Sequence, residues 1–260
     1  MGAIEGLLLD IDGVLAVSWE ALPGAVETLR WLRDERIPFR LITNTTTHTR
    51  GDLAETLRGA GFEVDPTEIV TAVVATASYL RAHHPDARVF LLSDGDAGSD
   101  LEGVELVGPH EGADIVVLGG ACEDFTYATV NRVFQLLMDG AALVGMHRNL
   151  YWRTNEGWQL DAGAYIAGLE EATGRTAAIC GKPASAFFEA ALRELGVPAE
   201  RAAMVGDDVT NDVLGAQAAE LTGVLVRTGK FRAGDLERAS GAPDHVLDSI
   251  AELPGWLAAS

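Results

Sequence analysis

The feature that most constrains this chain is a regular alternation of short apolar runs with segments of helical period. The first half of the pattern reads LLLDIDGV, PGAVETLRWLRDE, PFRLITN and TRGDLAETLRGAG, with Leu53 and Leu57 four residues apart in the last segment. The alternation resumes at AAICGKP and continues through ASAFFEAALRELG, AAMVGDD, DVLGAQAAEL and TGVLVRTG. Apolar strands separated by amphipathic helices are typical of parallel sheets, so we predict a doubly wound, Rossmann-like α/β core.

A second domain is predicted inside this pattern. The stretch from about Ala75 to Ile179 has strand-like runs of its own in ARVFLLS, ADIVVLGG and AALVGMH, and a helix is predicted near residues 125–138. About 100 residues are enough for a domain. We therefore expect a core of residues 1–74 and 181–260, interrupted by an inserted α/β domain of residues 75–180.

Composition excludes several classes of partner. Asp and Glu outnumber Lys and Arg by 39 to 19, and the resulting formal charge of −20 repels nucleic acid and anionic membranes. We see no signal peptide and no apolar run of the ~18 residues that span a bilayer. The two cysteines, Cys122 and Cys180, lack the spacing of a disulfide framework or a zinc site. A soluble cytoplasmic protein is expected.

Polar residues cluster in the loops that follow the predicted strands, where open α/β sheets bind their ligands. The four loops are Asp10-Ile11-Asp12-Gly13, Thr43-Asn44-Thr45-Thr46, Gly181-Lys182-Pro183, and Gly206-Asp207-Asp208 with Asp212 after it. Each alone is an ordinary turn or helix cap. All four together, in chain order at strand ends, favour one site. Because strand side chains alternate, Asp10 and Asp12 are expected to point the same way.

Clustered carboxylates repel one another unless a cation lies between them. Asp10, Asp207 and one of Asp208 and Asp212, with a backbone carbonyl and waters, would form the hard oxygen site that suits Mg²⁺. Asp12 completes the set of candidate metal residues.

The same residues predict phosphoryl transfer. Asp10 can attack phosphorus to form an aspartyl-phosphate, and Asp12 can act as the general acid and base. Thr43 and Asn44 can hold phosphoryl oxygens, and Lys182 can supply a positive charge to the transition state. Lysine is exceptional in this chain, because 17 of the 19 basic residues are Arg and only Lys182 and Lys230 are Lys.

At these loops the sequence resembles the haloacid dehalogenase superfamily of phosphotransferases. DIDGV matches its first motif, Thr43 and Asn44 its second, Lys182 in GKP its third and GDDVTND its fourth. Thr43 and Lys182 are 139 positions apart, which implies a large cap inserted between the second and third motifs. That arrangement resembles the subgroup of nitrophenyl-phosphatase and phospholysine phosphohistidine inorganic pyrophosphate phosphatase. The resemblance implies a Mg²⁺-dependent phosphatase for a small phosphorylated substrate, and a possible homodimer formed through the cap.

In the inserted domain, HRNLYWRTNEGWQLDAG mixes aromatic and polar residues. The resemblance makes His147, Tyr151 and Trp152 candidates for substrate selection, whereas the plain alternative is an exposed hairpin. Two other functions stay open on the residues alone: a phospho-accepting receiver-like module and a non-catalytic phosphate-binding protein. The inserted domain and Asp12 favour the phosphatase over both.

Overall fold

The structure is a computed structural model that describes residues 4–121, 123–154 and 157–259. Cys122 and the side chain of Trp152 lie outside the described residues. The chain forms two compact units. The first unit comprises Met1–Thr43, Arg50–Val70 and Lys182–Ser260, and the second unit comprises Asn44–Thr49 and Thr71–Gly181. The boundary expected between residues 74 and 75 falls inside a helix, α3 (Ala72–His83).

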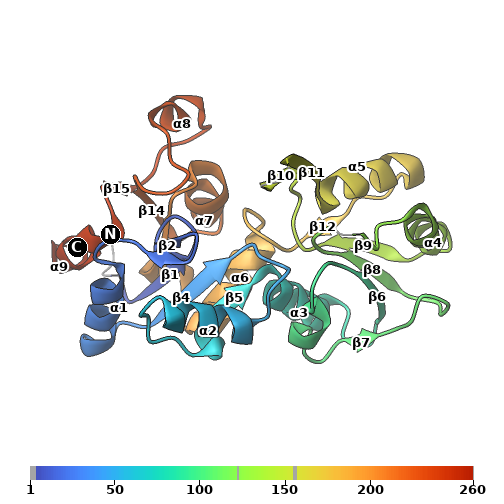
Figure 1. Ribbon diagram of the computed structural model, residues 1–260, viewed down its shortest axis with the longest axis horizontal. Helices are drawn as coiled ribbons and strands as arrows, with labels where there is room; N and C mark the ends of the chain where they lie inside the picture. Colours follow the sequence, from blue (N-terminus) through green and yellow to red (C-terminus); the bar gives the residue numbers. More distant parts are fainter. Residues whose placement is uncertain (1–3, 122, 155–156, 260) are drawn as a thin grey trace. The chain divides into compact units, whose positions relative to one another are not determined.

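The first unit contains a six-stranded sheet in the order β15-β14-β13-β1-β4-β5. Its strands are β1 (Gly6–Asp10), β4 (Phe39–Thr43), β5 (Ile69–Thr71), β13 (Ala202–Gly206), β14 (Thr222–Val226) and β15 (His245–Leu247). β1 pairs in parallel with both β4 and β13. β14 pairs in parallel with both β13 and β15. Segments from the two ends of the chain therefore form one sheet, blue and orange to red in Figure 1.

Helices bury both faces of this sheet. The helices of this unit are α1 (Ala25–Asp34), α2 (Arg50–Gly59), α6 (Ser185–Leu195), α7 (Gly215–Ala218), α8 (Ala233–Arg238) and α9 (Leu253–Ala259). Leu7 and Leu9 pack in one cluster with Leu29 of α1, Leu53 and Leu57. The alternate strand residue Leu8 is equally buried, and so are Phe187 and Phe188 of α6. Leu192 of α6 is only partly buried.

The second unit has a parallel sheet of its own, in the order β12-β9-β8-β6-β7. Its strands are β6 (Arg88–Leu92), β7 (Glu105–Leu106), β8 (Ile115–Leu118), β9 (Ala142–Gly145) and β12 (Ala178–Ile179). The resumed alternation begins at AAIC in the sequence, but this strand lies within residues 75–180, the range expected for the inserted domain. β12 pairs with β9, so the strand extends the second sheet. A two-residue strand has too little side-chain pattern to specify its partner.

Three helices cover the second sheet: α3, α4 (Tyr127–Met138) and α5 (Ala162–Thr173). Val133 of α4 and Ile166 of α5 pack in one cluster, whereas Val73 and Leu80 of α3 pack in another. An antiparallel hairpin, β10 (Tyr151–Thr154) with β11 (Gly157–Leu160), lies in this unit, and a small pair, β2 (Ala16–Val17) with β3 (Glu20–Ala21), in the first. The predicted α/β class is confirmed. Among the described residues, no helix is both long enough and apolar enough to span a bilayer.

Candidate active site

Strand register places three acidic side chains together in the first unit. Leu9 pairs with Val205, so Asp10 at the end of β1 and Asp207 after β13 leave the sheet at the same edge. Asp212 follows in a π-helical turn, η4 (Val209–Leu214). Carboxylate oxygens of Asp10, Asp207 and Asp212 lie within 4.8 Å of one another, and all three residues are buried. This group is called the acid cluster below.

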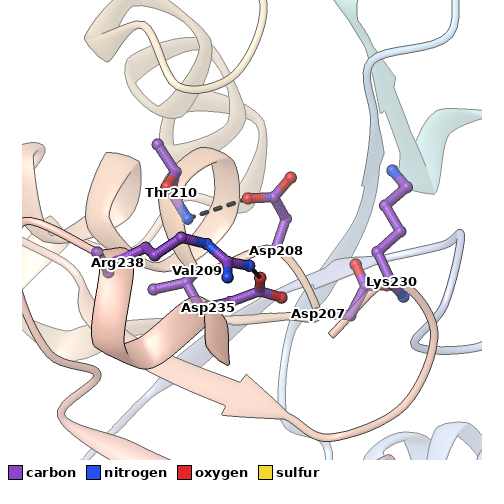
Figure 2. A pocket seen from close by; sticks show the side chains of 8 residues that line it. Asp207, Asp208, Val209, Thr210, Lys230, Asp235 and Arg238 are labelled. Atoms are coloured by element: carbon purple, nitrogen blue, oxygen red, sulfur yellow. Dashed lines mark hydrogen bonds and ion pairs between the residues drawn. The ribbon is translucent and has the colours of Figure 1, made fainter. Parts of the chain in front are cut away.

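Local structure decides which acid of the fourth loop joins the acid cluster. Asp208 caps η4, because its Oδ1 accepts hydrogen bonds from the amides of Thr210 (3.0 Å) and Asn211 (2.9 Å). Figure 2 shows the Asp208 carboxylate bonded to the Thr210 amide. Asp212 reaches the cluster because Gly206 lets it approach closely: a Cβ at position 206 would lie 2.3 Å from the Asp212 Cβ. Asp208 is therefore a helix cap outside the cluster.

Lys182 lies within the acid cluster. Its Nζ is 2.7 Å from Asp10 Oδ1 and 2.7 Å from Asp212 Oδ1, and its side chain is buried. Burial alone would lower the pKa of the ammonium, but the two adjacent carboxylates outweigh burial and raise it. Three carboxylates and one ammonium leave the site with a net charge of −2 when all are ionised.

The electrostatics of the acid cluster fit a divalent cation. Burial raises the pKa of Asp10 even though Lys182 opposes it, and burial also raises the pKa of Asp207. Burial, with repulsion from Asp10, raises the pKa of Asp212 to about 6. Asp207 Oδ1 is buried and has no hydrogen-bond partner among the described residues. Mg²⁺ takes oxygen ligands, so the buried Asp207 Oδ1, without a partner in the described structure, is available to bind it. The excess negative charge of the site would be balanced by the two charges of the cation.

Asp12 does not join the acid cluster. β1 ends at Asp10, so strand alternation does not govern Asp12, and the expectation that both side chains point the same way stays a prediction. Asp12 is exposed and makes only an isolated bridge to Ala16 within the described structure. Thr43 is buried at the end of β4, one residue after Ile42, which pairs with Asp10. Asn44 is grouped with the second unit.

The candidate selectors of the inserted domain lie in different environments. Tyr151 of β10 is 59% exposed, as an exposed hairpin requires. His147 is buried: its Nε2 lies 3.8 Å from Asp161 Oδ1, and its Nδ1 accepts a hydrogen bond from the Asn149 amide. Burial lowers the pKa of His147, although Asp161 opposes this. All of these contacts lie inside the second unit.

Sequence reasoning missed the segment that supports Asp207. The backbone N–H of Lys230 donates to Asp207 Oδ2, and the Thr228 hydroxyl donates to the carbonyl of Gly13 at 2.5 Å. Lys230 and Asp207 line one pocket of the first unit (Figure 2). The only signal in the sequence was the rarity of lysine, because a contact made by a backbone amide leaves no mark on residue type.

Comparison with known proteins identifies the family of this chain. Residues 7–107 match a family described as haloacid dehalogenase-like hydrolase, and residues 179–253 match one described as HAD-hydrolase-like. The chain is 39% identical over 257 residues to the Haloacid dehalogenase-like hydrolase domain-containing protein 2 of Homo sapiens, covering 96% of this chain and 97% of the relative. It is 34% identical over 263 residues to the Phospholysine phosphohistidine inorganic pyrophosphate phosphatase of Rattus norvegicus, covering 99% and 95%.

Among solved structures, the 4-nitrophenylphosphatase of Thermotoga maritima matches with a TM-score of 0.88 at 31% identity, covering 97% of each chain. The likeness spans both units of this chain, and so it includes the inserted α/β domain. The resemblance that the four loops suggested is confirmed. By sequence over nearly its whole length, and by fold, the chain belongs to the haloacid dehalogenase-like hydrolase family.

Proposed function

We propose that this hydrolase is a Mg²⁺-dependent phosphatase that cleaves a small phosphorylated substrate through an aspartyl-phosphate on Asp10. The observation that carries the proposal is the buried acid cluster with Lys182 Nζ 2.7 Å from both Asp10 and Asp212. The names of two relatives, a phosphohistidine and pyrophosphate phosphatase and a 4-nitrophenylphosphatase, support phosphoryl compounds as the substrate class.

Asp10 is the proposed nucleophile. Lys182 binds its Oδ1, so we assign Oδ2 as the oxygen that attacks phosphorus. As the new O–P bond forms, the bond from phosphorus to the leaving oxygen breaks, and Asp12 protonates that oxygen. Asp12 then takes a proton from water, which attacks the aspartyl-phosphate, and Asp10 is regenerated as phosphate leaves. The exposure of Asp12 is compatible with exchange of protons with solvent.

The remaining residues bind and orient. Thr43 and Asn44 are proposed to hold phosphoryl oxygens, and the Lys182 ammonium to stabilise the charge that develops on them. Asp10, Asp207 and Asp212 would hold Mg²⁺, and Asp208 would support the site as the cap of η4. Mg²⁺ would neutralise the clustered carboxylates and polarise the phosphoryl group.

The second unit is proposed to act as the cap that selects the substrate. Tyr151, exposed on β10, is the candidate selector that the structure supports best, and Trp152 follows it in the same strand. The buried contacts of His147 favour a positioning role for this residue. A cytoplasmic location and a homodimer formed through this unit are parts of the same proposal, and the dimer is tested by light scattering of the purified protein.

The test is hydrolysis of p-nitrophenyl phosphate with Mg²⁺ and with excess chelator. We expect turnover only with Mg²⁺, and none detectable in Asp10→Asn, because loss of a covalent nucleophile costs many orders of magnitude. Asp34→Asn is the matched control, the same change at an exposed position of α1. Full activity in chelator contradicts the metal requirement. Turnover of Asp10→Asn within about tenfold of wild type, only ~1.4 kcal/mol in barrier, contradicts the nucleophile.

A further inference from the structure

The segment Thr228–Lys230, which follows β14, contacts two loops beside the acid cluster in the first unit. Through the Thr228 hydroxyl it binds the carbonyl of Gly13, in the loop that follows Asp10. Through the backbone N–H of Lys230 it binds Oδ2 of Asp207. Figure 2 shows Lys230 next to Asp207, with its side chain extended away from the carboxylate. The segment therefore acts on Asp207 through its backbone.

Two glycines let the backbone close on Asp207 from two sides. A Cβ on Gly13 would lie 2.0 Å from Asp207 Oδ2, and so would a Cβ on Gly229. A Cβ on Gly229 would also lie 2.4 Å from the Gly13 Cα. Both glycines have positive φ, +92° at Gly13 and +60° at Gly229, which other residues rarely adopt. The Asp207 carboxylate is thus held between two loops that no larger residue could form.

This packing treats the two oxygens of Asp207 differently. Oδ2 is fixed by the Lys230 amide, whereas Oδ1 is buried without a hydrogen-bond partner in the described part of the chain. A buried oxygen in this state costs free energy unless a ligand satisfies it. Fixing Oδ2 limits rotation of the carboxylate, so Oδ1 keeps one orientation before any ligand arrives.

We propose that Thr228, Gly229 and Lys230 form a positioning segment for metal binding, which fixes Asp207 Oδ2 so that Oδ1 is presented to a divalent cation. The inference rests on the proposed function, because it assumes that Asp207 is a metal ligand. Groups that orient a ligand commonly change metal affinity by 10–100-fold when they are altered. The affinity for the cation, rather than the chemical step, is the quantity that this segment controls.

Gly229→Ala tests the segment, since the added Cβ displaces either Asp207 or the Gly13 loop. Gly196→Ala is the matched control: Gly196 also has positive φ, +75°, but an added Cβ meets no atom within 4 Å in the described structure. Binding of Mn²⁺ and Mg²⁺ to the metal-free proteins is measured by calorimetry. We expect Gly229→Ala to weaken binding at least about tenfold, and Gly196→Ala to stay within about twofold of wild type.

Thr228→Val and Thr228→Ser form a second pair, which keeps the test valid if Gly229→Ala does not fold. Valine removes the hydroxyl that binds Gly13 at nearly the same volume, and serine restores it. We expect weaker metal binding in Thr228→Val, recovery in Thr228→Ser, and a raised KM for Mg²⁺ with kcat at saturating Mg²⁺ little changed.

The outcomes separate two failures. Folded variants at Gly229 and Thr228 that bind the cations like wild type overturn the positioning role and leave the proposed function intact. Equal weakening in Gly229→Ala and Gly196→Ala also overturns it, because backbone strain then explains the loss. A wild-type protein that binds neither cation contradicts the proposed function itself.

Discussion

Lys182 illustrates how the site depends on the shape of a single side chain. Its compact ammonium lies 2.7 Å from one oxygen of Asp10 and 2.7 Å from one oxygen of Asp212, in a buried position. A guanidinium carries the same charge but is planar and wider, and it binds through a fork of parallel donors. The chain uses Arg at 17 of its 19 basic positions. We therefore infer that position 182 requires the compact shape of an ammonium as well as its charge.

We expect Lys182→Arg to lower kcat roughly a hundredfold or more, comparable to the loss of one transition-state donor. Lys230→Arg is expected to cost much less, because the contact of Lys230 with Asp207 is made by the backbone and survives the change. The measurement is kcat at saturating Mg²⁺, with circular dichroism as the control for folding. Near wild-type kcat in a folded Lys182→Arg enzyme would show that charge alone suffices, and equal losses would mean that both lysine side chains matter alike.

At the scale of elements, the turn η4 separates two acids that look equivalent in the sequence. Asp208 accepts hydrogen bonds from the amides of Thr210 and Asn211. Asp212, four residues later, faces Lys182 and Asp10. One short helical turn therefore assigns one carboxylate to stability and the other to the acid cluster.

Substitutions in η4 should separate these roles. Asp208→Ala is expected to lower the free energy of unfolding by about 1 kcal/mol, because the cap is lost, while Asp208→Asn keeps most of it. Asp212→Asn should instead abolish tight Mg²⁺ binding with a fold that stays intact. Urea unfolding and calorimetric titration measure the two effects. The assignment fails if Asp208→Asn loses Mg²⁺ affinity as severely as Asp212→Asn.

At the scale of the whole molecule, binding of a cation and of protons is expected to change the free energy of unfolding. A cation that binds only the folded acid cluster stabilises it by about 2.7 kcal/mol at a concentration of 100 Kd. We expect Mg²⁺ to raise the unfolding temperature of wild type and to leave that of Asp212→Asn unchanged. Thermal unfolding with Mg²⁺ and with chelator checks this, and an equal shift in both proteins would place the stabilising cation elsewhere.

The second unit carries a separate dependence on pH. Burial lowers the pKa of His147 below its ordinary value of about 6.5, so the folded state binds fewer protons than the unfolded state. The contribution of neutral His147 to the free energy of unfolding is complete above about pH 6.5, the pKa in the unfolded state, and is lost as the pH falls through the pKa of His147 in the folded state. Protonation also removes the lone pair on Nδ1 that accepts the Asn149 amide.

Unfolding free energies at pH 8 and pH 5, measured with chelator present, test this dependence. Wild type should lose more stability than His147→Gln between the two values, because glutamine does not titrate. Parallel losses in the two proteins would rule out His147 as the titrating group.

The sequence by itself determined the α/β class, the inserted domain and the loops that carry Asp10, Lys182 and Asp207. These are properties of local pattern: strands and helices have different periods, and parallel strands bring their carboxyl ends to one edge of the sheet. Helix faces were predictable for the same reason, as the burial of Leu53 and Leu57 shows.

Only the tertiary structure decided what depends on contacts between distant residues. Lys182 meets Asp10 across 172 positions of the chain, and Thr228 meets Gly13 across 215. It also decided that Asp12 lies outside the acid cluster, because the point at which β1 ends is set by pairing with its neighbours. The sequence does not specify strand register or the partners of backbone amides. Nearly every residue carries the same backbone N–H and C=O groups, whichever strand or side chain these groups finally bind.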